Sequence, residues 1–121
     1  MTNQEMFDKA YIGLRGQNFE RAINSRGGCV YLNSDGKRCA WGHVDTSLDA
    51  THSGSVSYLR LEGIGLAAQL DDGQTWFATQ LQAAHDAIFD DTGRSAQAQT
   101  PAMVKEALEN LARKYNLTIP Q

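Results

Sequence analysis

The sequence predicts an α+β fold: a single small domain, residues 1–121, in which about three helices pack on a β-hairpin or small antiparallel sheet. Two kinds of pattern lead to this fold class. Three segments carry apolar residues at helical spacing, and two of them begin with strong start signals for a helix. Between the first and the second segment, two β-prone runs flank an Asp-Gly pair, which is the strongest short-range signal for a hairpin.

The first helix is predicted to begin at Thr2. Thr2 and Glu5 have the Thr-x-x-Glu spacing of a capping box, in which each side chain bonds the backbone N–H of the other residue. Gly13 and Gly16 weaken the end of this helix. The residues between these signals form one apolar stripe at three- and four-residue steps: Met6, Phe7, Ala10, Tyr11 and Leu14.

The hairpin is predicted around residues 29–41. Its arms are Cys29-Val30-Tyr31-Leu32 and Lys37-Arg38-Cys39-Ala40-Trp41, and its turn is formed by Asn33-Ser34-Asp35-Gly36. Residues 45–55 read as a loop because they are rich in Ser, Thr, Asp and Gly. The pattern of residues 56–61 fits a strand and a short helix equally well.

Two further helices are predicted in the second half of the chain. One runs from about Thr75 to Phe89, and the other begins with Thr100 as its N-cap and Pro101 at its first position. Asn116 is expected to adopt the left-handed conformation that ends this last helix. The expected core positions of the two helices are Phe77, Leu81, Ala84 and Ile88, and Val104, Leu108, Leu111 and Tyr115.

Composition excludes several classes of protein. The chain has 11 basic and 14 acidic residues, a net charge of −3 and 41% hydrophobic residues, which is typical of one globular domain. No apolar run reaches the roughly 20 residues of a membrane helix, and the N-terminus does not resemble a signal peptide. Two cysteines are too few for a disulfide scaffold, and the acidic balance argues against general nucleic-acid binding. We therefore expect a cytoplasmic protein that binds neither membrane nor nucleic acid directly and uses no cofactor.

Negative charge is concentrated in the middle of the chain. Residues 41–93 contain one basic residue, Arg60, and eight acidic residues, so this segment carries a net charge of −7. Such a field attracts basic partners and speeds their capture. An alternative is a solvated surface whose neighbours in space supply the missing cations. We name these eight residues the acidic block: Asp45, Asp49, Glu62, Asp71, Asp72, Asp86, Asp90 and Asp91.

The two cysteines lie on opposite arms of the predicted hairpin, separated by nine residues. A two-residue turn places Cys29 and Cys39 on opposite faces. A three-residue loop places them diagonally on one face, about 7–8 Å apart, which is too long for an unstrained disulfide. Both cysteines are therefore predicted to be small buried apolar residues.

Two chemical alternatives use the same residues. Cys29, Cys39, His43 and His85 supply four zinc-type ligands, although cysteine ligands of structural zinc are usually two to four residues apart. A Cys-His hydrolase would use Cys29 as nucleophile and His85 as base, with Asp86 or Asp45 orienting the histidine. Adjacent helical residues point about 100° apart, so Asp86 is poorly placed for that role, and His85 reads more simply as a hydrogen-bonded core histidine.

Two stretches resemble a known family. Cys29-Val30-Tyr31, then Gly36, then Lys37-Arg38-Cys39-Ala40-Trp41-Gly42 resemble its pattern Cys-x-Tyr, a turn with Gly, and Cys-Ala-x-Gly. Leu81-Gln82-Ala83-Ala84-His85-Asp86 resembles its downstream Leu-Gln-x-x-His-Asp. The family consists of short, mostly uncharacterised proteins of bacteria, phages and prophages, and the resemblance extends over residues 3–91. It implies a cytoplasmic protein of a mobile element. The motif residues of unknown role are Cys29, Tyr31, Gly36, Cys39, Gly42 and His85.

The predicted function is therefore that of a phage- or prophage-type accessory protein. It would bind and modulate or inhibit a host protein, such as a defence or nucleic-acid-handling factor, through the acidic block. This interpretation favours a binding protein over an enzyme. The alternative is a small enzyme or metal-binding protein centred on Cys29, Cys39 and His85.

Overall fold

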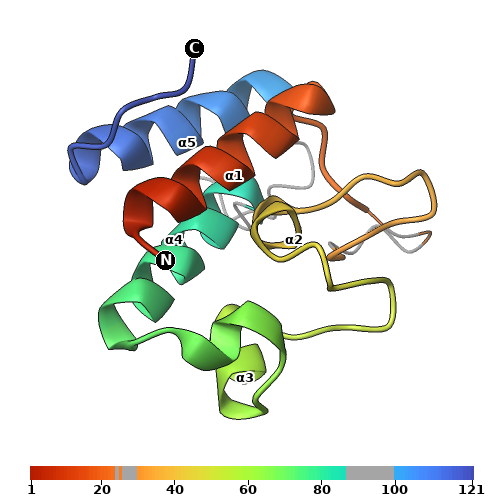
Figure 1. The fold of residues 1–121 in the computed structure, drawn as a ribbon. Helices are drawn as coiled ribbons and strands as arrows, with labels where there is room; N and C mark the ends of the chain where they lie inside the picture. The colour runs from red at the N-terminus through yellow and green to blue at the C-terminus, as the bar shows by residue number, and fades with distance from the viewer. Residues whose placement is uncertain (24, 26–29, 87–99) are drawn as a thin grey trace, which may run out of the picture.

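A computed structural model describes residues 1–23, 25, 30–86 and 100–121 (Figure 1). In these residues the protein is a small all-helical domain without a β-strand, so the predicted α+β fold class is wrong. Its elements, in chain order, are α1 (Asn3–Gly16), α2 (Ala40–Val44), α3 (Val56–Leu61), the 3₁₀ helix η1 (Gly65–Gln69), α4 (Asp72–Asp86) and α5 (Pro101–Lys114).

The predicted reversal of the chain at Asp35-Gly36 is present, but residues 30–41, the described part of the predicted hairpin, form no strand pair. The Asn33 N–H donates to the Lys37 carbonyl at 3.0 Å, and the Gly36 N–H donates to the Asn33 carbonyl at 3.1 Å. Gly36 has a φ of 81°, which is the left-handed conformation expected at the end of a three-residue loop. This loop closes the turn without continuing into a strand pair among the described residues.

The segment that was expected to form the second arm becomes a helix instead. Cys39 is the N-cap residue of α2, and Ala40, Trp41 and Val44 of that helix are buried. Burial of Trp41 in the domain core outweighs the β propensity of this run, because β propensity depends strongly on tertiary context. Cys29, at the start of the first predicted arm, lies outside the described residues.

The three predicted long helices are confirmed within the described residues. Thr2 and Glu5 form the capping box of α1, with both hydrogen bonds at 3.0 Å. Thr100 caps α5 and Pro101 occupies its first turn, as expected. All five residues of the first apolar stripe are buried, and so are Phe77, Leu81, Val104, Leu108 and Leu111.

Helix α4 begins at Asp72, three residues earlier than predicted. Asp71 accepts a hydrogen bond from the Gln74 N–H at 2.7 Å, and Gln74 Oε1 accepts one from the Asp71 N–H at 2.9 Å. This reciprocal pair satisfies two backbone donors that a helix start leaves open. The predicted end of this helix at Phe89 lies outside the described residues.

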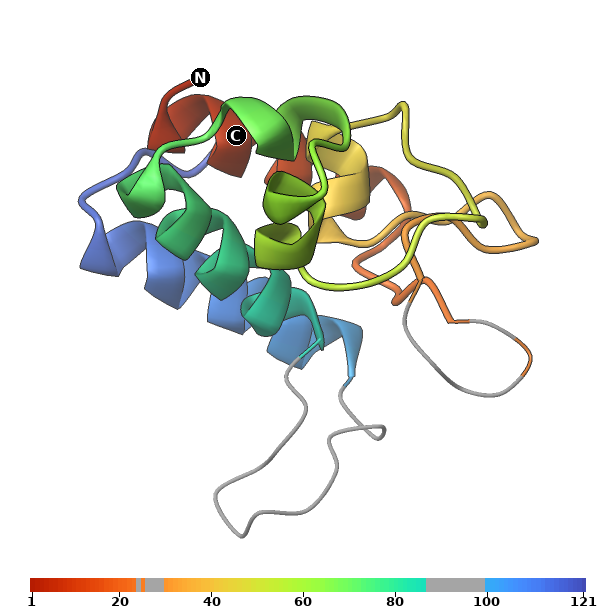
Figure 2. The same cartoon turned by 90° about the horizontal axis from the view of Figure 1, so that it is seen from below.

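The long helices surround a shared apolar core. Figure 1 shows α1 beside α5 and in front of α4, and α2 against the end of α1. Seen from below in Figure 2, α4 and α5 lie side by side, and the α3–η1 segment packs across the start of α4. Trp41, Phe7 and Phe77 are the largest fully buried side chains of this core.

Candidate functional site

The described motif residues form one packing unit around the start of α2. Tyr31 is buried, and its hydroxyl donates to the Gly54 carbonyl at 2.5 Å. A Cβ added at Gly42 would lie 2.4 Å from the Tyr31 carbonyl oxygen, so a side chain at residue 42 would push α2 away from this segment. Cys39, the N-cap residue of α2, is fully buried. The spacing of Tyr31, Gly36, Cys39 and Gly42 therefore has a structural explanation that requires no chemistry.

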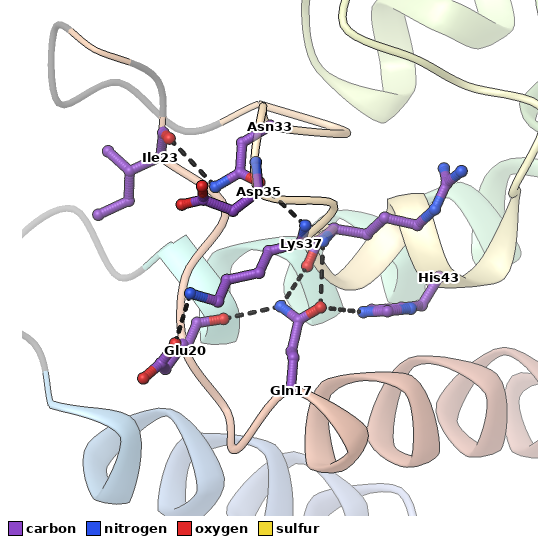
Figure 3. Close-up of polar contacts among 8 residues, drawn as sticks. Gln17, Glu20, Ile23, Asn33, Asp35, Lys37 and His43 are labelled. Atoms are coloured by element: carbon purple, nitrogen blue, oxygen red, sulfur yellow. Dashed lines mark hydrogen bonds and ion pairs between the residues drawn. The ribbon is translucent and has the colours of Figure 1, made fainter.

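A half-buried amide, that of Gln17, holds this unit to the end of α1 (Figure 3). Gln17 Nε2 donates to the carbonyls of Glu20 and Arg38, each at 2.8 Å, and Gln17 Oε1 accepts the Arg38 N–H at 3.1 Å. These three backbone partners fix the orientation of the amide. The 2.9 Å contact between Gln17 Oε1 and His43 Nε2 is consequently a bond that the imidazole donates. The residues next to Gln17 in the sequence do not predict these long-range hydrogen bonds.

The hydrogen bond to Gln17 gives His43 a role in holding the fold together. The imidazole lies directly over α1, where a Cβ added at Gly13 would be 2.3 Å from the ring. Nearby, Lys37 and Glu20 form an ion pair with 2.6 Å between Nζ and Oε2, which raises the pKa of the lysine. His43 thus joins the turn, α1 and α2.

The metal and hydrolase alternatives gain no support from the described residues. Among them, no three His, Cys, Asp or Glu side chains lie close enough together to hold a metal ion. Cys39 is fully buried, and His43 hydrogen-bonds to Gln17. Cys29 and the side chains of His85 and Asp86 lie outside the described part of the chain.

The acidic block divides into a buried residue and several exposed ones. Asp45 is only 4% exposed. Its Oδ1 accepts bonds from the Ser47 N–H at 3.1 Å and the Ser47 hydroxyl at 2.5 Å, and its Oδ2 accepts the Leu66 N–H at 2.9 Å. A Cβ at Gly65 would lie 2.2 Å from Oδ2, so glycine leaves the space that this carboxylate fills. Asp45 therefore joins α2 to η1. Because it is buried, it does not belong to the partner-facing surface on which it was predicted to lie.

Asp49 is exposed but lies in the loop before α3, apart from the start of α4. Its Oδ1 accepts the Thr51 hydroxyl at 2.5 Å and the Thr51 N–H at 2.8 Å, and these bonds are the main reason that the pKa of Asp49 is lowered. Glu62, Asp71 and Asp72 are exposed where α3 ends and α4 begins. The side chain of Asp86 and both Asp90 and Asp91 lie outside the described residues.

Glu62, Asp71 and Asp72 lie near large apolar side chains that α3 and α4 also expose. Arg60 of α3 donates to Asp72 of α4 at 2.7 Å, which fixes the two helices beside each other. Trp76 lies one turn after Asp72 on the same side of α4 and is 59% exposed. Leu61 and Tyr58 of α3 are 84% and 48% exposed. We name this surface the α3–α4 face: Tyr58, Arg60, Leu61, Glu62, Asp71, Asp72 and Trp76.

The exposure of Trp76 could not be predicted from its spacing. It flanks the apolar stripe of α4, so the sequence is compatible with a core position or an interface position for it. Trp41, the other tryptophan, is fully buried. The way the other helices pack around α4 leaves Trp76 exposed, and that packing is a property of the folded domain.

Comparisons of the chain with protein-family models, curated proteins and solved structures find no match. The similarity to a family of bacterial and phage proteins therefore stays a prediction. In the described part of the chain, no helix combines the length and the apolar character needed to cross a bilayer.

Proposed function

We propose that the protein is a binding module that attaches to a basic protein surface through the α3–α4 face. The observation that carries the proposal is the exposure of three large apolar side chains, Tyr58, Leu61 and Trp76, on two helices that the Arg60–Asp72 ion pair joins. Aromatic residues in the centre of a protein interface often contribute most of its binding energy. Surrounding charges add specificity and speed to the association.

The charge of the face indicates the chemistry of the partner. Glu62, Asp71 and Asp72 are opposed by a single cation, Arg60, which already bonds Asp72. A partner with lysine or arginine residues around an apolar socket would complement this arrangement. The resemblance to phage and prophage proteins favours a bacterial host protein as that partner, for example a defence or nucleic-acid-handling factor that the module would modulate or inhibit.

Affinity capture from a bacterial lysate tests the proposal when wild-type protein is compared with matched variants. Trp76→Ala removes the exposed aromatic side chain, and Ile12→Ala is its control because Ile12 is 50% exposed on α1. Glu62→Gln/Asp72→Asn removes two charges from the face, and Asp35→Asn/Glu106→Gln removes two exposed charges elsewhere. Asp71 is left unchanged because it caps α4.

We expect one bacterial protein to be retained by the wild type and by both controls. Trp76→Ala should lower its retention by about tenfold or more. Salt should weaken capture by the wild type more steeply than capture by Glu62→Gln/Asp72→Asn, because screening acts on the charges that were removed. Equal retention by all five proteins, or no specific retention by any of them, would contradict the proposed function.

A further inference from the structure

A cavity of about 380 Å³ opens between the segment before the 33–37 turn, the loop before α3 and the middle of α4. Its volume is near the lower end of the roughly 300–1,000 Å³ that is usual for small-molecule sites. The described residues that line it include Val30, Tyr31, His52, Val56, Thr79 and Ala83. The cavity is distinct from the protein-binding proposal, since none of the seven residues of the α3–α4 face is among these.

The walls of the cavity are held in place by contacts within the fold. Tyr31 Oη donates to the Gly54 carbonyl at 2.5 Å, and Ser55 Oγ caps α3 by accepting the Tyr58 N–H at 3.1 Å. Gly54 has a φ of 95°, and a Cβ there would lie 2.5 Å from the Tyr58 ring. The loop therefore adopts its shape before any ligand arrives, which lowers the ordering cost of binding.

The lining is mainly apolar, and its residues include a hydrogen-bond donor and a hydrogen-bond acceptor. Val30, Val56 and Ala83 contribute apolar surface, and the described lining contains no Lys, Arg, Asp or Glu. A formally charged ligand would lose its hydration here without gaining an opposite charge. The described walls thus favour an uncharged molecule.

His52 is a lining residue whose ring carries a hydrogen-bond donor. The Asp49 N–H is 3.0 Å from His52 Nδ1, so in the neutral imidazole Nδ1 accepts this bond and the proton is on Nε2. Asp49 Oδ1 is also 3.1 Å from Nδ1, but it already accepts two bonds from Thr51.

Thr79 offers an acceptor. Its hydroxyl donates to the Thr75 carbonyl at 2.8 Å, which leaves the lone pairs of Oγ1 directed away from that bond. A ligand that carries both an acceptor for His52 and a donor for Thr79 would match the two groups. Heterocycles with ring nitrogens or carbonyls beside N–H or amino groups have this combination.

We propose that this cavity binds an uncharged nitrogen heterocycle of nucleobase or nucleoside size, with His52 donating to it and Thr79 accepting from it. The probes are adenosine and uridine as uncharged nucleosides, their 5′-monophosphates as charged counterparts, and indole as an apolar ring of similar size. Binding is followed by amide chemical shifts of the labelled protein during titration.

The variants separate occupancy of the cavity from hydrogen bonding. Ala83→Leu places a larger side chain at the exposed edge of the cavity, and Ala102→Leu is the same change at an exposed position of α5. Thr79→Val removes the hydroxyl at nearly constant volume. Unfolding curves for each variant are the control that checks whether the fold is retained.

We expect saturable shifts around residues 52–56 and 79–83 with at least one nucleoside, and weaker binding of its monophosphate. Ala83→Leu should weaken nucleoside binding roughly tenfold or more, because it overfills the site, whereas Ala102→Leu should not change it. Thr79→Val should weaken nucleoside binding about fivefold, the usual value of one neutral hydrogen bond, without affecting indole.

Three outcomes would overturn the proposal. One is the lack of saturable shifts with either nucleoside up to about 10 mM, a concentration that detects even very weak complexes. Another is equal binding by Ala83→Leu and Ala102→Leu, which would place the ligand elsewhere. The third is binding of indole alone, which would assign the cavity to an apolar side chain of a partner.

Discussion

Replacing Asp45 with asparagine should lower the free energy of unfolding by about 2 kcal/mol, because the buried carboxylate accepts three hydrogen bonds. An asparagine has a single side-chain oxygen. If that oxygen takes the place of Oδ1, the NH₂ group faces the Leu66 N–H. If the amide is reversed, the NH₂ group faces the Ser47 N–H. In each orientation one backbone donor loses its acceptor.

The magnitude follows from two opposing effects. A hydrogen bond to a charged group contributes about 1.5–3 kcal/mol, and the bonds that survive become neutral and weaker. Removing the charge also removes part of the desolvation cost of a side chain that is 4% exposed. The loss of the hydrogen bonds outweighs this gain. We therefore expect the free energy of unfolding to fall by about 2 kcal/mol, in the lower half of that range, and Tm to fall by about 7 °C.

Chemical denaturation monitored by tryptophan fluorescence provides the measurement, since Trp41 is buried in the core. Asp35→Asn is the matched control: it removes the same charge from an exposed turn residue, and its free energy of unfolding should change by less than about 0.5 kcal/mol. If Asp45→Asn is as stable as Asp35→Asn, the assigned role of Asp45 between α2 and η1 is wrong.

Further predictions concern α1. Gly13→Ala should destabilise the protein by about 1–3 kcal/mol because the new methyl group meets the His43 ring. Gly16→Ala is the control: its methyl group meets no atom within 4 Å, so it should leave stability unchanged or raise it. Equal unfolding midpoints for the two variants would contradict the contact between Gly13 and His43. Burial, followed by the hydrogen bond to Glu109, raises the pKa of Tyr11 to about 12. A tyrosine of the unfolded chain ionises near pH 10, so this contribution to stability is complete below about pH 10 and is lost as pH rises through 12. Tyr11→Phe should therefore lose less stability between pH 9 and 12 than the wild type in denaturant titrations, and parallel curves would refute the assignment.

The candidate sites could be predicted only in part. The charge pattern located the acidic block, and the resemblance selected Tyr31, which lines the cavity. Neither indicated that Asp45 turns inward to bond Leu66, twenty-one residues along the chain. Thr79 carried no signal at all, because a threonine within a helix becomes part of a cavity only when a distant loop lies opposite it.

The sequence by itself determined the features whose hydrogen bonds and contacts lie within four residues. These include the capping box of α1, the Thr100 cap of α5, and the turn closed by Asn33 and Lys37. Apolar residues at helical spacing likewise defined which faces of the long helices are buried, because that spacing places them on one side whatever they pack against.

The tertiary structure alone decided the state of the segment after the turn. The Trp41 N–H donates to Gln82 Oε1 at 2.9 Å, across 41 residues, and that long-range bond accompanies a helix where local preference favoured a strand. It also decided that Trp41 is buried whereas Trp76 is exposed. For these two tryptophans, burial depends on which distant segment covers the side chain, and their neighbours in the sequence do not indicate it.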